Sequence, residues 1–237
     1  MASWQTSVRD VVRSALVEKV DRNHDESDRA FLRRRIVVVV TLVVGATLLG
    51  VSLSVSPGDS AFYPLTIGLA AAWIIGGFAS GPLHLGRITF NGSMRRPIVT
   101  PILIGLAAGA VFVAGALVVR QIPPLADFTE NVLAHARFGS LALIVFITLL
   151  NGVAEEIFFR GALFAAIGRK KPVLISTIIY TVVTLASGNP MLAFAAITLG
   201  FVLALQRRAS GGILAPILTH VAWSTVMVLV LPPLFVS

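Results

Sequence analysis

Two adjacent glutamates, Glu155 and Glu156, lie in a stretch of chain that otherwise has the composition of a membrane span. An ionised carboxylate at bilayer depth costs about 2.5–3.5 kcal/mol even on the mild insertion scale. Because acidic residues inside spans are rare and usually functional, this pair is the first place to look for chemistry.

Arg160 follows Glu156 by four residues, so the two side chains share one face of a helix and can form an ion pair. Glu155 is rotated by about 100° from Glu156, which leaves its carboxylate available for acid–base chemistry. The alternative is that all three residues form a structural charge network that only holds helices together.

His220 lies in the apolar stretch 212–233, the last one in the chain. It is about 12 Å, at 1.5 Å per residue, from the end of that stretch that is predicted to face the cytoplasm. Glu155 lies about 19 Å from the same edge of its own span, and helix tilt can bring the two side chains together. A glutamate and a histidine at one site are the minimum for activating water, with or without a metal ion. The alternative for His220 is a hydrogen bond within the bundle.

The composition predicts the fold class that must position these residues. Hydrophobic residues make up 56% of the chain, charged residues 13%, and the mean hydropathy is +0.89. These values predict an all-α, polytopic transmembrane helical bundle without β-strands. The absence of cysteine excludes disulfides, thiolate metal sites and a cysteine nucleophile.

A spanning helix needs about 20 apolar residues. Seven stretches approach this length, and the fifth and sixth are short. They fall near residues 36–55, 61–79, 98–119, 139–167, 172–187, 191–206 and 212–233.

Basic residues predict the orientation of these spans. Segments 1–35, 80–97, 168–171 and 206–211 hold 8, 3, 3 and 2 of the 19 Lys and Arg residues. This asymmetry predicts about seven spans in a cell membrane (the plasma membrane for a bacterial chain), with the N-terminus inside and the C-terminus outside. It also explains the net charge of +8 without nucleic acid, and makes anionic lipid at the cytoplasmic face the expected partner.

The chain divides into a polar N-terminal segment, residues 1–35, and the transmembrane bundle, residues 36–237. Apolar residues recur at helical spacing over residues 3–20, which predicts an amphipathic helix followed by a charged linker. This helix lies either on the membrane surface or on the cytoplasmic face of the protein itself.

Residues at about 140–231 resemble the CAAX protease and bacteriocin-processing family of intramembrane endopeptidases. The pattern Glu155-Glu156-x-x-x-Arg160 is similar to the first motif of this family. The family continues with Phe-x-x-x-His on the next helix and His-x-x-x-Asn near the C-terminus.

The second and third motifs differ from the family pattern in this chain. The second falls at Tyr180 to Thr184, which puts threonine in place of the histidine, and the third runs from His220 to Ser224, with serine in place of the asparagine. A threonine hydroxyl cannot replace imidazole as a base and is a poor zinc ligand. Loss of one oxyanion donor typically costs about 100- to 1,000-fold in rate.

The resemblance implies an endopeptidase, similar to CAAX prenyl proteases and bacteriocin self-immunity proteins, that cleaves a membrane-embedded peptide or protein. It implies that Glu155 and His220 activate water, with zinc as a candidate cofactor ligated by the same two residues. Ser224 would assist at the oxyanion, and Glu156 is either a third catalytic group or the structural partner of Arg160.

Two other functions stay open at this point. A family member without catalytic activity would bind a membrane peptide or partner protein in the same site, and the motif replacements favour this alternative. A proton-coupled transporter would use Glu155 and His220 as a relay, but the chain shows no inverted repeat.

Overall fold

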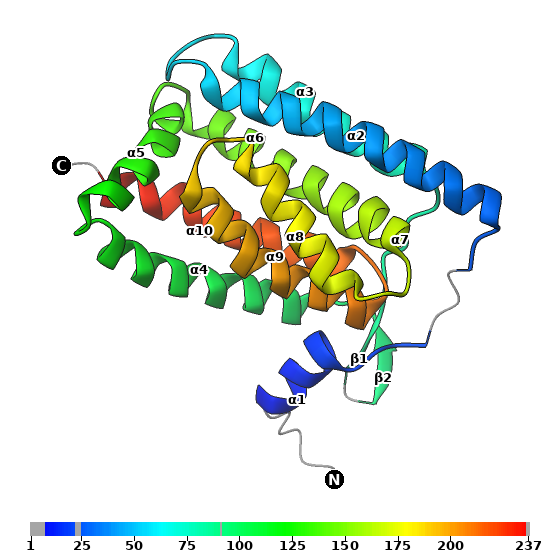
Figure 1. Cartoon of the computed structure of the whole chain (residues 1–237). Helices are drawn as coiled ribbons and strands as arrows, with labels where there is room; N and C mark the ends of the chain where they lie inside the picture. The colour runs from blue at the N-terminus through cyan, green and yellow to red at the C-terminus, as the bar shows by residue number, and fades with distance from the viewer. Residues whose placement is uncertain (1–7, 22–24, 91, 236–237) are drawn as a thin grey trace.

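The computed structural model describes residues 8–21, 25–90 and 92–235, and nearly all of its regular structure is helical (Figure 1). This confirms the prediction of a polytopic helical bundle. The elements in chain order are α1 (Val8–Val12), the π-helix η1 (Arg13–Val17), α2 (Asp28–Ser54), α3 (Phe62–Ser80), β1 (Ile88–Phe90), β2 (Ser93–Arg95), α4 (Val99–Val119), α5 (Pro123–Arg137), α6 (Leu141–Glu155), the π-helix η2 (Glu156–Leu163), α7 (Phe164–Ile167), α8 (Pro172–Leu185), α9 (Pro190–Ser210) and α10 (Leu214–Leu234).

Among the described residues, six helical segments are long and apolar enough to cross a membrane. They are α2, α3, α4, the continuous run Leu141–Ile167, α9 and α10. The fifth predicted span corresponds to α8, which has only 14 residues and is therefore about 21 Å long, shorter than the roughly 30 Å hydrocarbon core. The count of seven spans and their orientation stay predictions.

Local sequence signals explain where several of these helices begin. The side chains of Ser27 and Ser140 accept hydrogen bonds from backbone N–H groups in the first turns of α2 and α6, and Asn189 does the same for α9. Such residues satisfy N–H groups that the helix itself leaves without partners. Pro172 and Pro190 stand at the start of α8 and α9, where proline costs no hydrogen bond.

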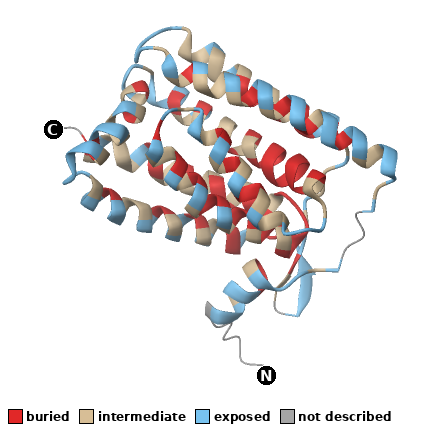
Figure 2. Ribbon diagram, in the orientation of Figure 1, coloured by how far each residue is buried: buried red, intermediate tan, exposed pale blue. Residues whose placement is uncertain are grey.

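The core surrounds the segment that carries the two glutamates. Buried residues gather along η2 and the facing parts of α9 and α10, whereas α2 and α4 are mostly exposed or half-buried (Figure 2). Trp73 of α3 is 1% exposed and its ring centroid lies 4.6 Å from that of Phe158. Gly45 of α2 contacts this indole, and a Cβ there would clash with it. Aromatic packing therefore holds α2 and α3 against η2.

The amphipathic helix α5 was not predicted, because its segment is too polar to be a span. His135 in its last turn bonds to the Val55 carbonyl through Nε2 at 3.0 Å, and Arg137 donates to the Phe235 carbonyl at 3.1 Å. The helix thus packs across the ends of α2 and α10 at one end of the bundle.

The expectation of no β-strands is wrong for one short hairpin. Strands β1 and β2 pair antiparallel, with Ile88 opposite Arg95, Thr89 opposite Met94 and Phe90 opposite Ser93. Three residues in each strand are too few to give a recognisable period-2 pattern, so the sequence could not reveal this hairpin.

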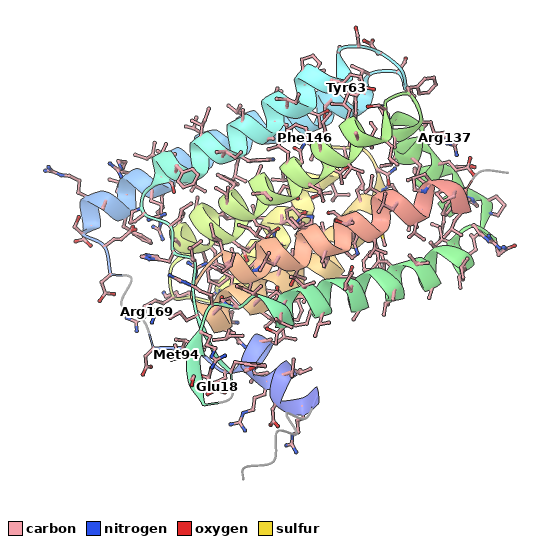
Figure 3. All side chains as sticks on the ribbon, turned by 180° about the vertical axis from the view of Figure 1, so that it is seen from behind. Glu18, Tyr63, Met94, Arg137, Phe146 and Arg169 are labelled. Carbon is pink, nitrogen blue, oxygen red and sulfur yellow. The ribbon has the colours of Figure 1, made fainter. Side chains whose placement is uncertain are left out.

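The four basic segments meet at the other end of the bundle. Backbone N–H groups of Val20 and Arg87 donate to the carbonyls of Ala209 and Ser210, at 3.1 and 2.9 Å. Figure 3 places Arg169, Met94 and Glu18 at this end, far from Tyr63 and Arg137. The segments predicted to be cytoplasmic therefore share one end, although the side of the membrane is still a prediction.

The described part of the N-terminal segment packs on the protein itself. The side chains of Ser14 and Ala15 in η1 are buried, and the carbonyl of Leu16 accepts a hydrogen bond from Arg208 of α9 at 3.3 Å. These contacts favour the second of the two predicted placements of this helix. Residues 1–7 lie outside the described residues.

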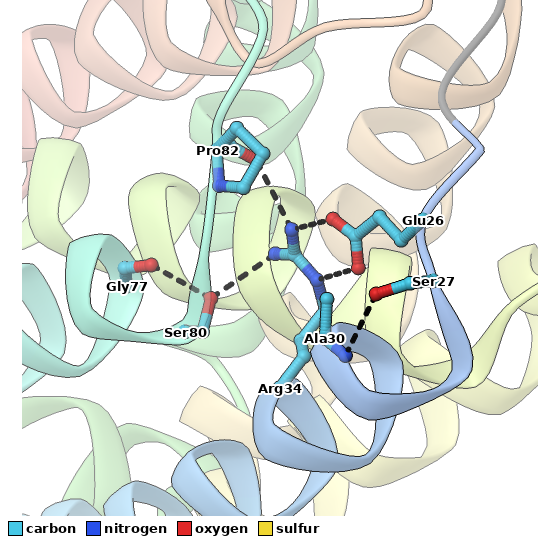
Figure 4. A network of polar contacts seen from close by, with 7 residues as sticks. All are labelled: Glu26, Ser27, Ala30, Arg34, Gly77, Ser80 and Pro82. Carbon is cyan, nitrogen blue, oxygen red and sulfur yellow. Dashed lines mark hydrogen bonds and ion pairs between the residues drawn. The ribbon is translucent and has the colours of Figure 1, made fainter.

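A buried arginine ties the linker after this segment to the bundle (Figure 4). Arg34 is 1% exposed and pairs through two nitrogens with the Glu26 carboxylate. It also donates to Ser80 Oγ at 3.1 Å and to the Pro82 carbonyl at 3.2 Å. The Arg34 hydrogen bond lowers the pKa of Glu26 below its ordinary value near 4.5. Charge pairing thus joins residue 26, α2 and the end of α3.

We expect Glu26→Gln to lower the free energy of unfolding by about 2 kcal/mol, because a hydrogen bond to a buried charge is lost. Since the folded-state pKa of Glu26 is depressed, its contribution is complete above the ordinary pKa and disappears as the pH falls through the lowered value. Thermal unfolding in detergent at pH 7 and in acid measures both effects. The exposed Glu18→Gln is the matched control, and equal melting of the two variants at pH 7 would contradict the role of Glu26.

Candidate functional site

The two glutamates lie where an α-helix changes to a wider helix. Helix α6 ends at Glu155, and the π-helix η2 begins at Glu156. All eight residues of η2 are buried, and wide turns of this kind occur frequently at functional sites. The Arg160 carbonyl in η2 accepts a hydrogen bond from Arg207 Nε of α9 at 2.6 Å. The wide turn is therefore tied to a neighbouring helix.

Glu156 is fully buried and has two partners on the same oxygen. Arg160 donates to its Oε1 at 3.0 Å, and Nδ1 of His220 lies 2.8 Å from the same atom. Burying a carboxylate is costly unless it is paired and hydrogen-bonded. The contact that was predicted between Glu156 and Arg160 is thus present, and His220 joins it from α10.

Arg160 also contacts α9 and α8. It is 1% exposed, donates to the Gly200 carbonyl at 3.0 Å, and its guanidinium carbon lies 4.5 Å from the centroid of the Tyr180 ring. A Cβ on Gly200 would lie 3.1 Å from Arg160 Nη2 and 2.9 Å from Tyr180 Cδ1. Glycine at position 200 therefore allows α9 to approach both side chains.

Glu155 has a different environment from its neighbour. The Tyr180 hydroxyl donates to its Oε2 at 2.5 Å, and the described residues donate no hydrogen bond to its other oxygen. Its side chain is half-buried, whereas Glu156 is 0% exposed. We expected His220 to meet Glu155; its hydrogen bond goes to Glu156, and a phenol occupies the partner position of Glu155.

His220 and Ser224 lie one turn apart on α10 and face α6. They are 6% and 3% exposed. A Cβ on Gly152 would lie 3.5 Å from His220 Cδ2 and 3.6 Å from Ser224 Oγ, so both side chains lie against the turn before the glutamates. Because a carboxylate only accepts hydrogen bonds, the contact with Glu156 favours a proton on Nδ1 and leaves Nε2 of His220 as an acceptor.

Thr184 does not take part in this group of side chains. Its hydroxyl donates to the Tyr180 carbonyl at 2.8 Å, within its own helix. The polar group that α8 contributes is the Tyr180 hydroxyl, which was not among the predicted site residues. A tyrosine in a membrane helix, at the position where the family pattern has phenylalanine, was the signal that could have identified it.

The described side chains of this group are not arranged as a three-ligand metal site. Among the described residues, no group of three or more His, Asp or Glu side chains is arranged to hold a metal ion. One oxygen of Glu155 is taken by Tyr180, and Nδ1 of His220 is taken by Glu156, whereas catalytic zinc usually has three protein ligands. Zinc therefore stays a prediction from the resemblance alone.

The comparisons with known proteins support the resemblance found in the sequence. Residues 137–226 match the family model described as type II CAAX prenyl endopeptidase Rce1-like. This range runs from the end of α5 into α10 and includes every residue of the site. No curated protein and no solved structure matches the chain. The match supports a function of the same kind as that of CAAX-type intramembrane proteases.

We expect Gly200→Ala to destabilise the protein by about 1–3 kcal/mol, because the added methyl group overpacks Arg160 and Tyr180. Gly115→Ala in α4 is the matched control, since a Cβ there meets no atom within 4 Å. Thermal unfolding of both variants in detergent measures the difference. Equal stability of the two variants would show that α9 does not need its close approach at residue 200.

Proposed function

We propose that this chain, whose residues 137–226 match the type II CAAX prenyl endopeptidase Rce1-like family model, hydrolyses a peptide bond in a membrane-embedded substrate. One observation carries the proposal. A half-buried carboxylate, Glu155, stands beside a fully buried Glu156 that holds Arg160 and His220. The group combines one accessible base with a fixed imidazole.

Glu155 is the residue we assign to water activation. Its Oε2 is held by Tyr180, while Oε1 makes no hydrogen bond with the described residues. That oxygen is the one able to accept a proton from a water molecule. Glu156 is less suited to this role, because two partners share its Oε1 and its Oε2, which has no hydrogen-bond partner among the described residues, is fully buried.

His220 is assigned to assist through Nε2. A carboxylate on the opposite ring nitrogen fixes the tautomer and orientation of a histidine. Glu156 provides this carboxylate at 2.8 Å, and Arg160 holds Glu156 in turn at 3.0 Å. The ion pair therefore positions the imidazole and does not itself react.

The proposed reaction is a metal-free hydrolysis. The water oxygen attacks the peptide carbonyl carbon while Glu155 takes one water proton. The Ser224 hydroxyl donates one hydrogen bond to the resulting oxyanion. The carbon–nitrogen bond then breaks, the proton passes to the leaving nitrogen, and a carboxylate and an amine are released. His220 stabilises the charge that moves through this sequence.

The setting of this reaction is a multi-pass membrane protein. We propose that the membrane is the cell membrane and that the basic end of the bundle faces the cytoplasm, where it contacts anionic lipid. The six long apolar helices fit a substrate peptide or protein that is itself in the bilayer.

A second candidate function is binding without catalysis. Thr184 supports it, because this residue stands where the family has a histidine and its hydroxyl is bonded within its own helix. A chain that kept the buried charge group but lost the chemistry would still hold a membrane peptide near Glu155.

We expect Glu155→Gln to lower the cleavage rate about 100- to 10,000-fold, because the base for water is lost. His220→Gln should also reduce it strongly, since the imidazole is replaced by an amide. The assay uses the full chain in nanodiscs with a farnesylated CAAX-type peptide and a panel of unmodified transmembrane peptides, and mass spectrometry identifies the products. Glu130→Gln in α5, outside the site, is the control and should cleave like the wild type.

Two results would contradict the peptidase proposal. A wild type that cleaves none of these peptides but retains one of them in the nanodisc would identify the binding function. Cleavage by Glu155→Gln at the wild-type rate would show that another group activates the water.

A further inference from the structure

We propose that Tyr180 of α8 is the positioning residue of Glu155 in a chain that lacks the second-motif histidine. The inference rests on the proposed function, and it adds a residue that neither the motif pattern nor the family match assigns. It starts from a single contact, the hydrogen bond of 2.5 Å from the Tyr180 hydroxyl to Glu155 Oε2.

The direction of this hydrogen bond is fixed by chemistry. A phenol gives up its proton far less readily than a carboxylic acid does, so at neutral pH Tyr180 donates and Glu155 accepts. A hydrogen bond to an ionised acceptor is roughly twice as strong as a neutral one. The phenol therefore holds one oxygen of Glu155 and leaves the other oriented for water.

The Tyr180 ring is itself immobilised. It is 9% exposed, with the Arg160 guanidinium carbon 4.5 Å and the Phe159 ring 4.6 Å from its centroid. Gly200 of α9 leaves the space that the ring needs. The hydroxyl thus has a fixed position, as a group that orients a catalytic carboxylate must have.

The residue one turn further along α8 does not compete for Glu155. The hydroxyl of Thr184 donates to the Tyr180 carbonyl at 2.8 Å. Tyr180 is therefore the residue of α8 that donates a hydrogen bond to the Glu155 carboxylate. A phenol holds the base but does not take a proton from water at neutral pH, so Glu155 keeps the role of base for the water.

The kinetic test compares Tyr180→Phe with Tyr63→Phe. These are the only two tyrosines in the chain, and Tyr63 lies at the other end of the bundle from the basic segments (Figure 3). Tyr180→Phe should lower kcat about 10- to 100-fold and leave KM unchanged, because Glu155 loses its orientation. Tyr63→Phe should behave like the wild type. An unchanged kcat in Tyr180→Phe would overturn the inference.

A motif exchange separates positioning from packing. The double variant Tyr180→Phe, Thr184→His places an imidazole one turn from the lost hydroxyl and should recover part of the kcat that Tyr180→Phe loses. Thr184→His alone should not raise kcat, because Tyr180 already donates a hydrogen bond to Glu155. A double variant no faster than Tyr180→Phe, or a gain from Thr184→His alone, would count against the proposed role.

A spectroscopic test needs no cleavage activity. Infrared difference spectra recorded during acid titration in nanodiscs report the carboxyl bands, and Glu155→Gln assigns the band of residue 155. Tyr180→Phe should shift this band to the frequency of a carboxyl group with one hydrogen bond fewer, whereas Tyr63→Phe should leave it in place. An unshifted band in Tyr180→Phe would overturn the contact.

A labelled protein covers the case in which Tyr180→Phe does not fold. In the Tyr63→Phe chain, a fluorinated tyrosine enters at position 180 alone and strengthens the hydrogen bond without removing an atom from the core. The Glu155 band should then shift in the opposite direction, and an unshifted band would contradict the inference. A wild-type protein that cleaves none of the peptides would contradict the proposed function. The spectra would still show whether Tyr180 donates a hydrogen bond to Glu155.

Discussion

The arrangement of the bundle around the site depends on one buried carboxylate. Glu156 is 0% exposed, and removing one partner of such a buried pair typically costs about 3–5 kcal/mol. Its partners come from η2 and α10, through Arg160 at 3.0 Å and His220 at 2.8 Å. Arg160 in turn requires the carbonyl of Gly200 in α9. A single charge therefore fixes the relative positions of three helical segments, which apolar packing alone would leave free to slide.

The same charge explains why two neighbouring glutamates differ. Glu155 and Glu156 are separated by about 100° around the helix, so one carboxylate points into the group formed with Arg160 while the other reaches α8. The first is occupied on Oε1 by two nitrogens, and the second accepts only the Tyr180 hydroxyl. Glu156 therefore joins the helices through its charge pairs, whereas Glu155 keeps an oxygen for chemistry. This difference follows from the angle between adjacent residues on a helix.

The sequence could predict what depends on local spacing. The predicted limits of most apolar segments agree closely with the helices, and the contact between Glu156 and Arg160 follows from four-residue spacing on one helix. The partner of His220 could not be predicted. Counting residues from the membrane edge along two tilted helices gives a depth that is too coarse to distinguish Glu155 from Glu156. Tyr180 was missed for the same reason: its hydroxyl meets a residue 25 positions away only through the packing of α8 on η2.

Helix α9 connects this group to the basic end of the bundle. Gly200 accepts from Arg160, and Arg207, about 10 Å further along the helix, donates to the Arg160 carbonyl at 2.6 Å. Two residues later Ala209 accepts from Val20 of the N-terminal segment at 3.1 Å. An axial displacement of α9 would disturb both hydrogen bonds to Arg160. Arg160 is therefore held by a helix whose far end contacts the N-terminal segment. The rigidity that the proposed chemistry requires comes in part from residues outside the three motifs.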